Sequence, residues 1–230
     1  MRLFRDRLKG MLGGEPSAGA PPGTGAASAK APAVKGTPLT RHSSGLEQFF
    51  FTIRDRPGLS LIDFAGASQA NISFITNLGH RLTSDDYVQS LELAFGGGDF
   101  YANQADEQRA AAFLADNLTY EDGQFDGALV WDSLQFLGPG LLASTVASLH
   151  RVLRPGSSLL AFFHADEKTE IVPTWHYRIA DAKTLTLVPR GMLRRAQFFN
   201  NRALEKLFQN FASVKFFLSR DSLREVIIRR

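Results

Sequence analysis

Carboxylates at the ends of two predicted strands are the residues of this sequence best suited to chemistry. Asp63 ends the apolar run LSLI, and Asp85 and Asp86 end the run HRLTS. Between them lie a turn of small residues, 65–68, and a segment with helical periodicity. Small residues in such a turn let the backbone approach a ligand closely. The pattern therefore predicts a site for a nucleotide-type cofactor.

The composition limits the other chemistry that this chain could do. The sequence has no cysteine, which excludes disulfides, thiolate metal sites and a cysteine nucleophile. No catalytic triad or metal cluster is recognisable, so no catalytic or metal-binding residue is predicted. No apolar run approaches the roughly 18 to 20 residues needed to span a bilayer, and no secretory signal is recognisable at the N-terminus. We expect a cytoplasmic protein.

Strand and helix patterns alternate along the chain and should position these carboxylates. Continuously apolar strands alternating with helices are typical of a mostly parallel α/β sheet covered on both faces. The C-terminal run instead predicts two strands joined by a turn, which makes an antiparallel hairpin. The predicted strands cover 59–66, 80–86, 125–131, 158–164 and two parts of 213–230, and the predicted helices cover 68–79, 87–95, 103–118, 141–153 and 201–211.

The N-terminal part is predicted to lie outside this domain. Residues 1–12 form a basic amphipathic segment that could lie at a membrane surface or dock on a protein partner. Residues 13–45 are rich in Gly, Ala, Pro and Ser, which predicts a disordered linker. The folded domain is then 46–230, and residues 165–200 are interpreted as an insert or lid with short strands.

Charge is segregated along the chain. Residues 1–45 carry seven Lys or Arg and two acids, residues 46–177 carry seven and seventeen, and residues 178–230 carry twelve and four. The basic residues are confined to the two ends, so a nucleic-acid partner is not expected. They could form solvated surfaces or a basic surface beside a site for an anionic substrate.

Two downstream motifs carry a resemblance to a known family. FDGALVWDSLQFL and LHRVLRPGSSLLAFFH resemble the fourth-strand and fifth-strand segments of the class I S-adenosylmethionine-dependent methyltransferases, and the likeness covers about residues 57–230. The resemblance implies a three-layer, Rossmann-like methyltransferase sandwich that ends in an antiparallel hairpin. It also implies S-adenosylmethionine as cofactor and a small-molecule methyl acceptor. The segment 165–200 would select the acceptor with Trp175, His176, Tyr177, Arg190, Arg194 and Arg195.

The resemblance also implies where the cofactor would bind. In the family, a glycine-rich loop follows the first strand, but here the three glycine slots hold Ala65, Ala67 and Gln69, so the loop is degenerate. Alanine keeps the small volume of glycine without its torsional freedom. The implied contacts of this loop are Asp63, Ala65, Gly66, Ala67 and Ser68.

Further contacts are implied at the ends of the following strands. The family binds the two ribose hydroxyls with a carboxylate, which suits Asp86 or Asp85, although either could instead cap the next helix. Asp116 or Asn117 would meet the adenine, or would simply end a helix. Trp131 and Asp132 would line the pocket, with plain packing as the alternative for Trp131. His164 could reach the acceptor or have a structural role.

Two functions follow from these predictions. The first is S-adenosylmethionine-dependent methyl transfer to a small-molecule acceptor. The alternative is a catalytically inactive methyltransferase-like binding or scaffolding protein, because degeneration of the glycine loop is what the loss of activity would produce. A nicotinamide-dependent dehydrogenase would need a G-x-G-x-x-G turn, which the sequence lacks. No feature of the sequence predicts an oligomeric state.

Overall fold

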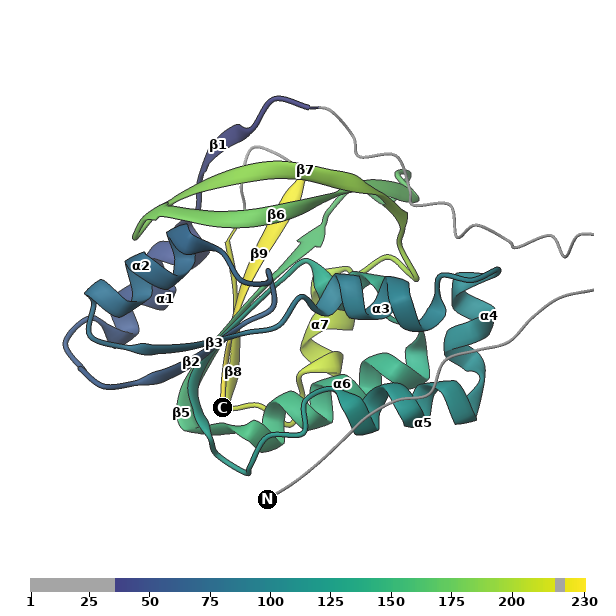
Figure 1. Ribbon diagram of the computed structural model, residues 1–230, viewed down its shortest axis with the longest axis horizontal. Coiled ribbons are helices and arrows are strands. Elements are labelled where there is room, and N and C mark those ends of the chain that lie inside the picture. Colours follow the sequence, from purple (N-terminus) through teal and green to yellow (C-terminus); the bar gives the residue numbers. More distant parts are fainter. Residues whose placement is uncertain (1–35, 218–221) are drawn as a thin grey trace, which may run out of the picture. The chain divides into compact units, whose positions relative to one another are not determined.

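The computed structural model describes residues 36–217 and 222–230. The predicted amphipathic segment 1–12 and residues 13–35 of the predicted linker lie outside the described residues. The described chain forms a six-stranded sheet with helices on both of its faces and a separate three-stranded sheet. This is the predicted Rossmann-like α/β sandwich (Figure 1).

The larger sheet has the order β3-β2-β4-β5-β9-β8. Four strands are parallel: β3 (Arg81–Ser84), β2 (Ser60–Asp63), β4 (Phe125–Trp131) and β5 (Leu153–His164). The hairpin of β8 (Ser213–Phe217) and β9 (Leu223–Arg229) closes the sheet in antiparallel fashion. The predicted mostly parallel sheet with a C-terminal antiparallel hairpin is thus confirmed.

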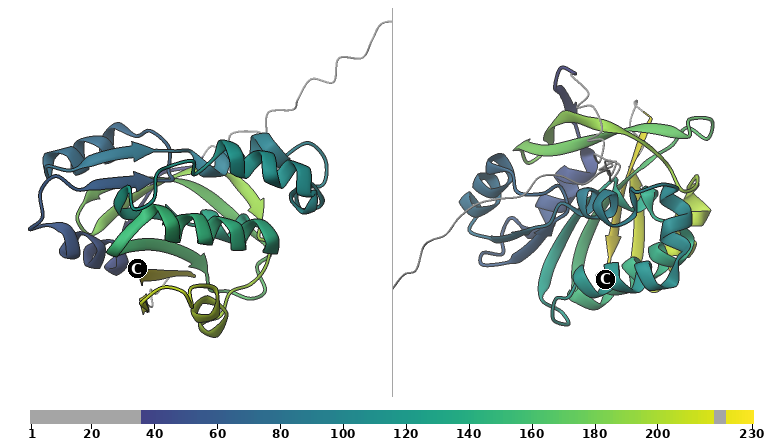
Figure 2. Two further views of the ribbon diagram at one scale, coloured as in Figure 1. Left: turned by 90° about the horizontal axis from the view of Figure 1, so that it is seen from below. Right: turned by 45° about the vertical axis from the view of Figure 1, so that its right-hand side comes forward.

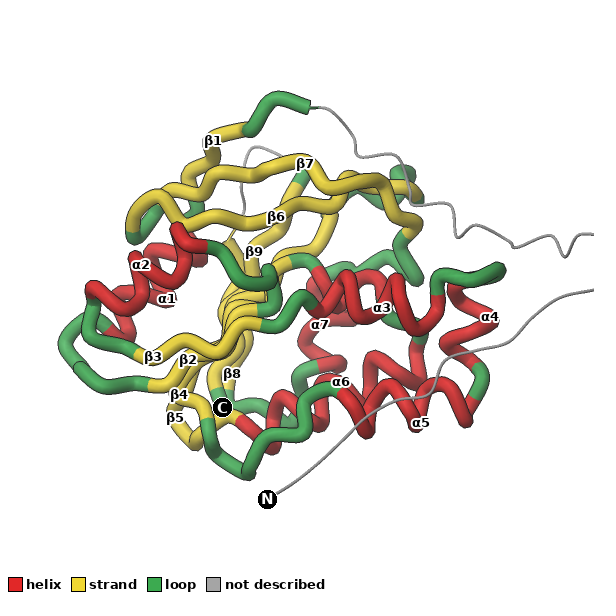
Figure 3. The backbone as a smooth tube through the Cα atoms, in the orientation of Figure 1, coloured by secondary structure: helices red, strands yellow, loops and turns green. Residues whose placement is uncertain are grey.

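Helices cover the two faces of this sheet (Figures 1 and 3). One face carries α1 (Ser44–Ile53) and α2 (Gln69–Asn77). On the other side lie α3 (Tyr87–Phe95), α4 (Phe100–Ala105), α5 (Glu107–Asp116), α6 (Pro139–Val152) and α7 (Asn201–Leu207). A short 3-10 turn, Ser133–Phe136, follows β4. Figure 2 shows α6 running along its face of the sheet.

Burial on both faces explains the composition of the central strands. Every residue of β4 is buried, as expected for a parallel strand covered by helices on both sides. At Gly127, a Cβ atom would lie 2.9 Å from the ring of Phe49 in α1 and 3.0 Å from Leu61 in β2. The close approach of α1 to the sheet therefore requires glycine at this position.

None of the described helices is long and apolar enough to cross a membrane.

The second sheet has the order β1-β7-β6 and is antiparallel. It consists of β1 (Leu39–His42) and a long hairpin of β6 (Ile171–Asp181) and β7 (Thr184–Arg194). In Figure 1 the hairpin lies across the end of the larger sheet toward which β5 runs. The buried Arg41 of β1 pairs with Glu225 of β9 at 2.6 Å and so links the two sheets.

The structure corrects three expectations. Strand β1 lies within the segment predicted as linker. The sequence pattern did not reveal it, because its pairing partner β7 is about 145 residues further along the chain. The segment 165–200 holds two eleven-residue strands and not short ones. Between β3 and β4, the described residues form helices and no strand, so Asp116 and Asn117 do not lie at a strand end, as the resemblance implied.

Candidate functional site

The candidate site lies at the carboxyl ends of β2, β3 and β4, beneath the β6–β7 hairpin. Parallel strands bring their carboxyl ends to one edge of a sheet, where ligands of α/β proteins bind. The site brings Asp63, Asp86 and Trp131 of the predicted set close to the hairpin residues Tyr177 and Arg190. The hydrogen bonds within this site decide what it can bind.

The turn after β2 is closed by its own hydrogen bonds. The Ala65 N–H donates to the Asp63 carboxylate at 2.9 Å, and the Gly66 N–H donates to the Asp85 carbonyl at 3.1 Å. An isolated antiparallel bridge also joins Ala65 to Asp86. Two backbone donors of the loop that would face a ligand are therefore already used.

The single glycine of this turn stands at its left-handed position. Gly66 has a φ of +80°, and an added Cβ would lie 3.1 Å from the Cβ of Asp86. The glycine slots of the family hold residues with ordinary torsions, because the only described non-glycine residues with positive φ are Leu118 and Trp131. The loop therefore keeps its shape without the family's glycines, whose slots are Ala65, Ala67 and Gln69.

Asp63 is fully buried and surrounded by donors. Its carboxylate accepts from the indole N–H of Trp131 at 2.6 Å and from the Asn71 side-chain amide at 2.7 Å, besides the Ala65 N–H. Burial raises the pKa of Asp63 to about 6, although these three hydrogen bonds work in the opposite direction. Asp63 thus has a structural role here, because its oxygens face the protein's own donors.

Asp86, the predicted ribose ligand, is paired within the protein. The Arg190 guanidinium of β7 donates to its carboxylate at 2.6 Å, and the side chains of Asp86 and Arg190 are 22% and 14% exposed, respectively. The same oxygen accepts from the Gln89 N–H at 3.0 Å, so Asp86 caps α3, as the alternative interpretation predicted. Arg190 also reaches Glu92 at 3.2 Å. A ribose diol would have to displace Arg190 from this carboxylate.

Asp85 is also engaged. Its carboxylate accepts from the Tyr120 hydroxyl at 2.6 Å. Burial raises the pKa of Tyr120, and the neighbouring Asp85 raises it further. This hydrogen bond ties the loop before β4 to the end of β3.

Trp131 and Asp132 face the hairpin. Trp131 has a φ of +53°, a left-handed conformation that a bulky residue rarely adopts, and it is fully buried. Its ring stacks on Tyr177 of β6, with centroids 4.8 Å apart and an interplanar angle of 3°. Burial raises the pKa of Asp132 to about 7, against a hydrogen bond with Tyr177 that lowers it. Tyr177 thus fills the space in front of β4.

The other predicted residues lie apart from this cluster. Asp116 is exposed at the end of α5, and Asn117 caps that helix with its side chain bonded to the Phe113 carbonyl at 2.9 Å. The helix-end interpretation is confirmed for both. At the end of β5, the His164 N–H donates to Gln135 at 3.1 Å, and its carbonyl accepts from Arg195 at 3.1 Å.

A cavity of about 390 Å³ separates the loop from the hairpin. It lies beside Tyr177, and its volume is within the usual range for small-molecule sites. One wall is the loop and the start of α2, and the other is β6; the lining residues are Ala65, Ala67, Ser68, Gln69, Ala70, His176, Tyr177 and Arg178. Within residues 36–217 and 222–230, no three His, Asp or Glu side chains gather in a way that could hold a metal ion.

Asn71 is the site residue that the sequence analysis missed. Its side-chain amide donates to Asp63 and, at 3.0 Å, to the Tyr177 carbonyl, and its side-chain oxygen accepts from the Ile179 N–H at 2.7 Å. Asn71 is fully buried on α2. A polar residue close after the turn was the only available signal.

No protein-family model and no curated protein matches this sequence. Among solved structures, the chain is similar to 1,6-didemethyltoxoflavin-N1-methyltransferase from Burkholderia thailandensis, at 13% identity and a TM-score of 0.45, over 82% of this chain and 79% of that one. It is also similar to the glycopeptide N-methyltransferase MtfA, at 17% identity and a TM-score of 0.44, over 82% of this chain and 87% of that one. Both of these proteins were crystallised with S-adenosylhomocysteine. A third similar structure is that of the PH0226 protein from Pyrococcus horikoshii OT3, at 15% identity and a TM-score of 0.48, over 80% of this chain and 87% of that one.

The residues as they lie do not fit S-adenosylmethionine. The predicted ribose carboxylate is in an ion pair, and the ring of Tyr177 covers Trp131. Asp116 and Asn117, the implied adenine contacts, lie at the end of α5 and apart from this cluster. The arrangement instead provides a hairpin that pairs with Asp86 through Arg190 and is joined to Asp63 through Asn71.

Proposed function

We propose that this chain is a binding protein on a methyltransferase-like fold, in which the β6–β7 hairpin takes the place of the cofactor and no methyl group is transferred. The observation that carries this proposal is the ion pair of Arg190 with Asp86 at 2.6 Å. A guanidinium is always charged and binds carboxylates tightly, so it competes effectively with a neutral diol.

Three further contacts support a hairpin held in place. Asn71 bonds the backbone of β6 on both sides of one residue, at the Tyr177 carbonyl and the Ile179 N–H. The Tyr177 ring is buried against Trp131. A lid that opens in each catalytic cycle should instead make few buried contacts.

S-adenosylmethionine-dependent methyl transfer to a small-molecule acceptor is the second candidate function. The cavity of about 390 Å³ beside the loop favours it, because it lies where the family's cofactor loop would meet its ligand. In that case the hairpin would have to move away from Asp86 before the cofactor could bind. The two candidates therefore differ in whether the wild-type chain takes up the cofactor.

Thermal unfolding with S-adenosylhomocysteine separates the two functions. A ligand that binds only the native state stabilises it by about 2.7 kcal/mol at roughly 100 times its Kd. We expect no shift of Tm for the wild-type chain. In the variant Arg190→Ala, Asp86 loses its partner on β7, and we expect a shift to appear.

The control variant is Arg202→Ala, an exposed arginine of α7 that should behave as the wild type does. A shift in the wild-type chain would overturn the proposal and favour methyl transfer. No shift in Arg190→Ala would show that the Arg190–Asp86 ion pair is not what keeps the ligand out.

A further inference from the structure

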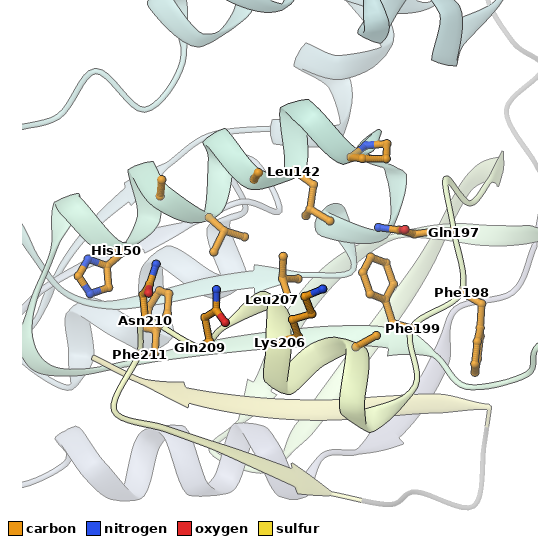
Figure 4. A pocket seen from close by; sticks show the side chains of 15 residues that line it. Leu142, His150, Gln197, Phe198, Phe199, Lys206, Leu207, Gln209, Asn210 and Phe211 are labelled. Atoms are coloured by element: carbon orange, nitrogen blue, oxygen red, sulfur yellow. The ribbon is translucent and has the colours of Figure 1, made fainter.

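A second cavity, of about 440 Å³, lies between α6 and α7, on the other side of the larger sheet from α1 and α2 (Figure 4). Its walls are mostly apolar. Leu142 and Val146 of α6 face Leu207 of α7, and the segment before α7 adds Phe198 and Phe199. The remaining lining residues are Pro139, Ala143, Ala147, His150, Gln197, Ala203, Lys206, Gln209, Asn210 and Phe211.

The aromatic walls are fixed by their neighbours. Phe199 packs on Phe163 of β5, with ring centroids 5.0 Å apart. Phe211 packs on Phe208 at 5.6 Å and, edge to face, on His150 at 4.9 Å. Because these rings are held by the sheet and by each other, the cavity exists before any ligand binds.

The polar side chains of the cavity are all capable of donating hydrogen bonds. They are His150, which is half-buried, and the exposed Gln197, Lys206, Gln209 and Asn210, and none of the five side chains makes a hydrogen bond or an ion pair with another described residue. The fifteen lining residues include no Asp or Glu. Figure 4 shows His150, Gln209 and Asn210 at one end of the cavity and Lys206 near its middle.

We propose that this cavity binds a single-chain amphiphile with a carboxylate head. The apolar walls would take the alkyl chain, since the removal of apolar surface from water is favourable. The Lys206 ammonium would bind the carboxylate, and the unpaired amides would bond its oxygens. The lysine and the absence of acids disfavour a basic occupant such as residues 1–12. This cavity is separate from the candidate site at the carboxyl ends of β2, β3 and β4, so the proposal does not depend on the function proposed above.

Calorimetric titration of the full chain with dodecanoate, below its micelle concentration, tests this proposal. We expect binding by the wild-type chain and at least tenfold weaker binding by Lys206→Glu, because the ammonium is replaced by a repelling charge. Ala147→Phe places a ring in the cavity from α6 and should abolish binding. The matched controls are Lys183→Glu and Ala111→Phe, at exposed positions away from the cavity, and both should bind within twofold of the wild type.

Two further probes test the charge of the head group. Dodecanol and dodecyltrimethylammonium have the same chain with a neutral and a cationic head, and both should bind at least tenfold more weakly than dodecanoate. The proposal is overturned if the wild-type chain does not bind dodecanoate, if Ala147→Phe binds it normally, or if the cationic amphiphile binds equally well.

Discussion

At the scale of single residues, Trp131 is the clearest case of a conformation imposed by its surroundings. A left-handed backbone at a bulky residue costs on the order of 1 to 3 kcal/mol and persists only where neighbours fix it. Here the indole N–H bonds a buried carboxylate, and the ring stacks on Tyr177. The strained position thus joins the sheet to the hairpin.

The variant Trp131→Phe should destabilise the protein by about 1 to 3 kcal/mol, because the buried Asp63 loses its shortest hydrogen bond while the aromatic stacking is largely kept. Urea unfolding monitored by circular dichroism measures this difference. The control is Trp175→Phe, since Trp175 is half-buried and has no side-chain hydrogen bond with the described residues. An equal loss in the two variants would contradict a specific role for the indole N–H.

At the scale of elements, the β6–β7 hairpin is held by one side chain of α2. Asn71 bonds β6 at two backbone positions and bonds β2 through Asp63. It therefore connects a helix, the larger sheet and the second sheet at one point. The hairpin's position over the candidate site depends on this connection and on the Arg190 ion pair.

The variant Asn71→Ala should loosen the hairpin before it unfolds the domain, because the Ile179 N–H loses its acceptor. Native-state hydrogen exchange should show lost protection at Ile179 and its neighbours in β6, with little change in β4. The control is Asn103→Ala, whose side chain bonds only the nearby carbonyls of Phe95 and Gly97. If Ile179 stays protected, the Asn71 contact does not hold the hairpin.

At the scale of the whole molecule, buried carboxylates link stability to pH. The pKa of Asp132 is raised to about 7 and that of Asp63 to about 6, both by burial. In the unfolded chain both would titrate near 4. The folded state therefore binds more protons than the unfolded state between about pH 4 and 7. The stability that the two carboxyl groups contribute is fully present below pH 4 and is lost as the pH rises through their pKa values in the folded state.

Stability should fall as pH rises from about 5 to 8, and Asp132→Asn should reduce this fall by on the order of 3 kcal/mol, because the amide cannot ionise. Urea unfolding at several pH values measures the slope. Asp116→Asn, at the exposed end of α5, is the control and should leave the slope unchanged. A wild-type slope in Asp132→Asn would rule out this carboxyl as the source.

The local pattern of the chain already determined the central architecture. The apolar runs of β4 and β5, the helix between them and the C-terminal hairpin all lie where periodicity and turn residues place them. These elements follow from the sequence because burial on both faces needs apolar residues throughout a strand. The capping of α3 by Asp86 was also predictable from the local sequence, because its carboxylate accepts from the N–H of Gln89, which is only three residues away.

Only the tertiary structure decided what happens at the candidate site. Arg190 meets Asp86 from 104 residues further along the chain, and Asn71 meets β6 from 106 residues away. No local pattern encodes such pairings, because each depends on how the hairpin folds back over the sheet. The sequence thus determined a methyltransferase-like fold with its carboxylates at the strand ends, while the tertiary contacts decided that those carboxylates bind the protein's own side chains.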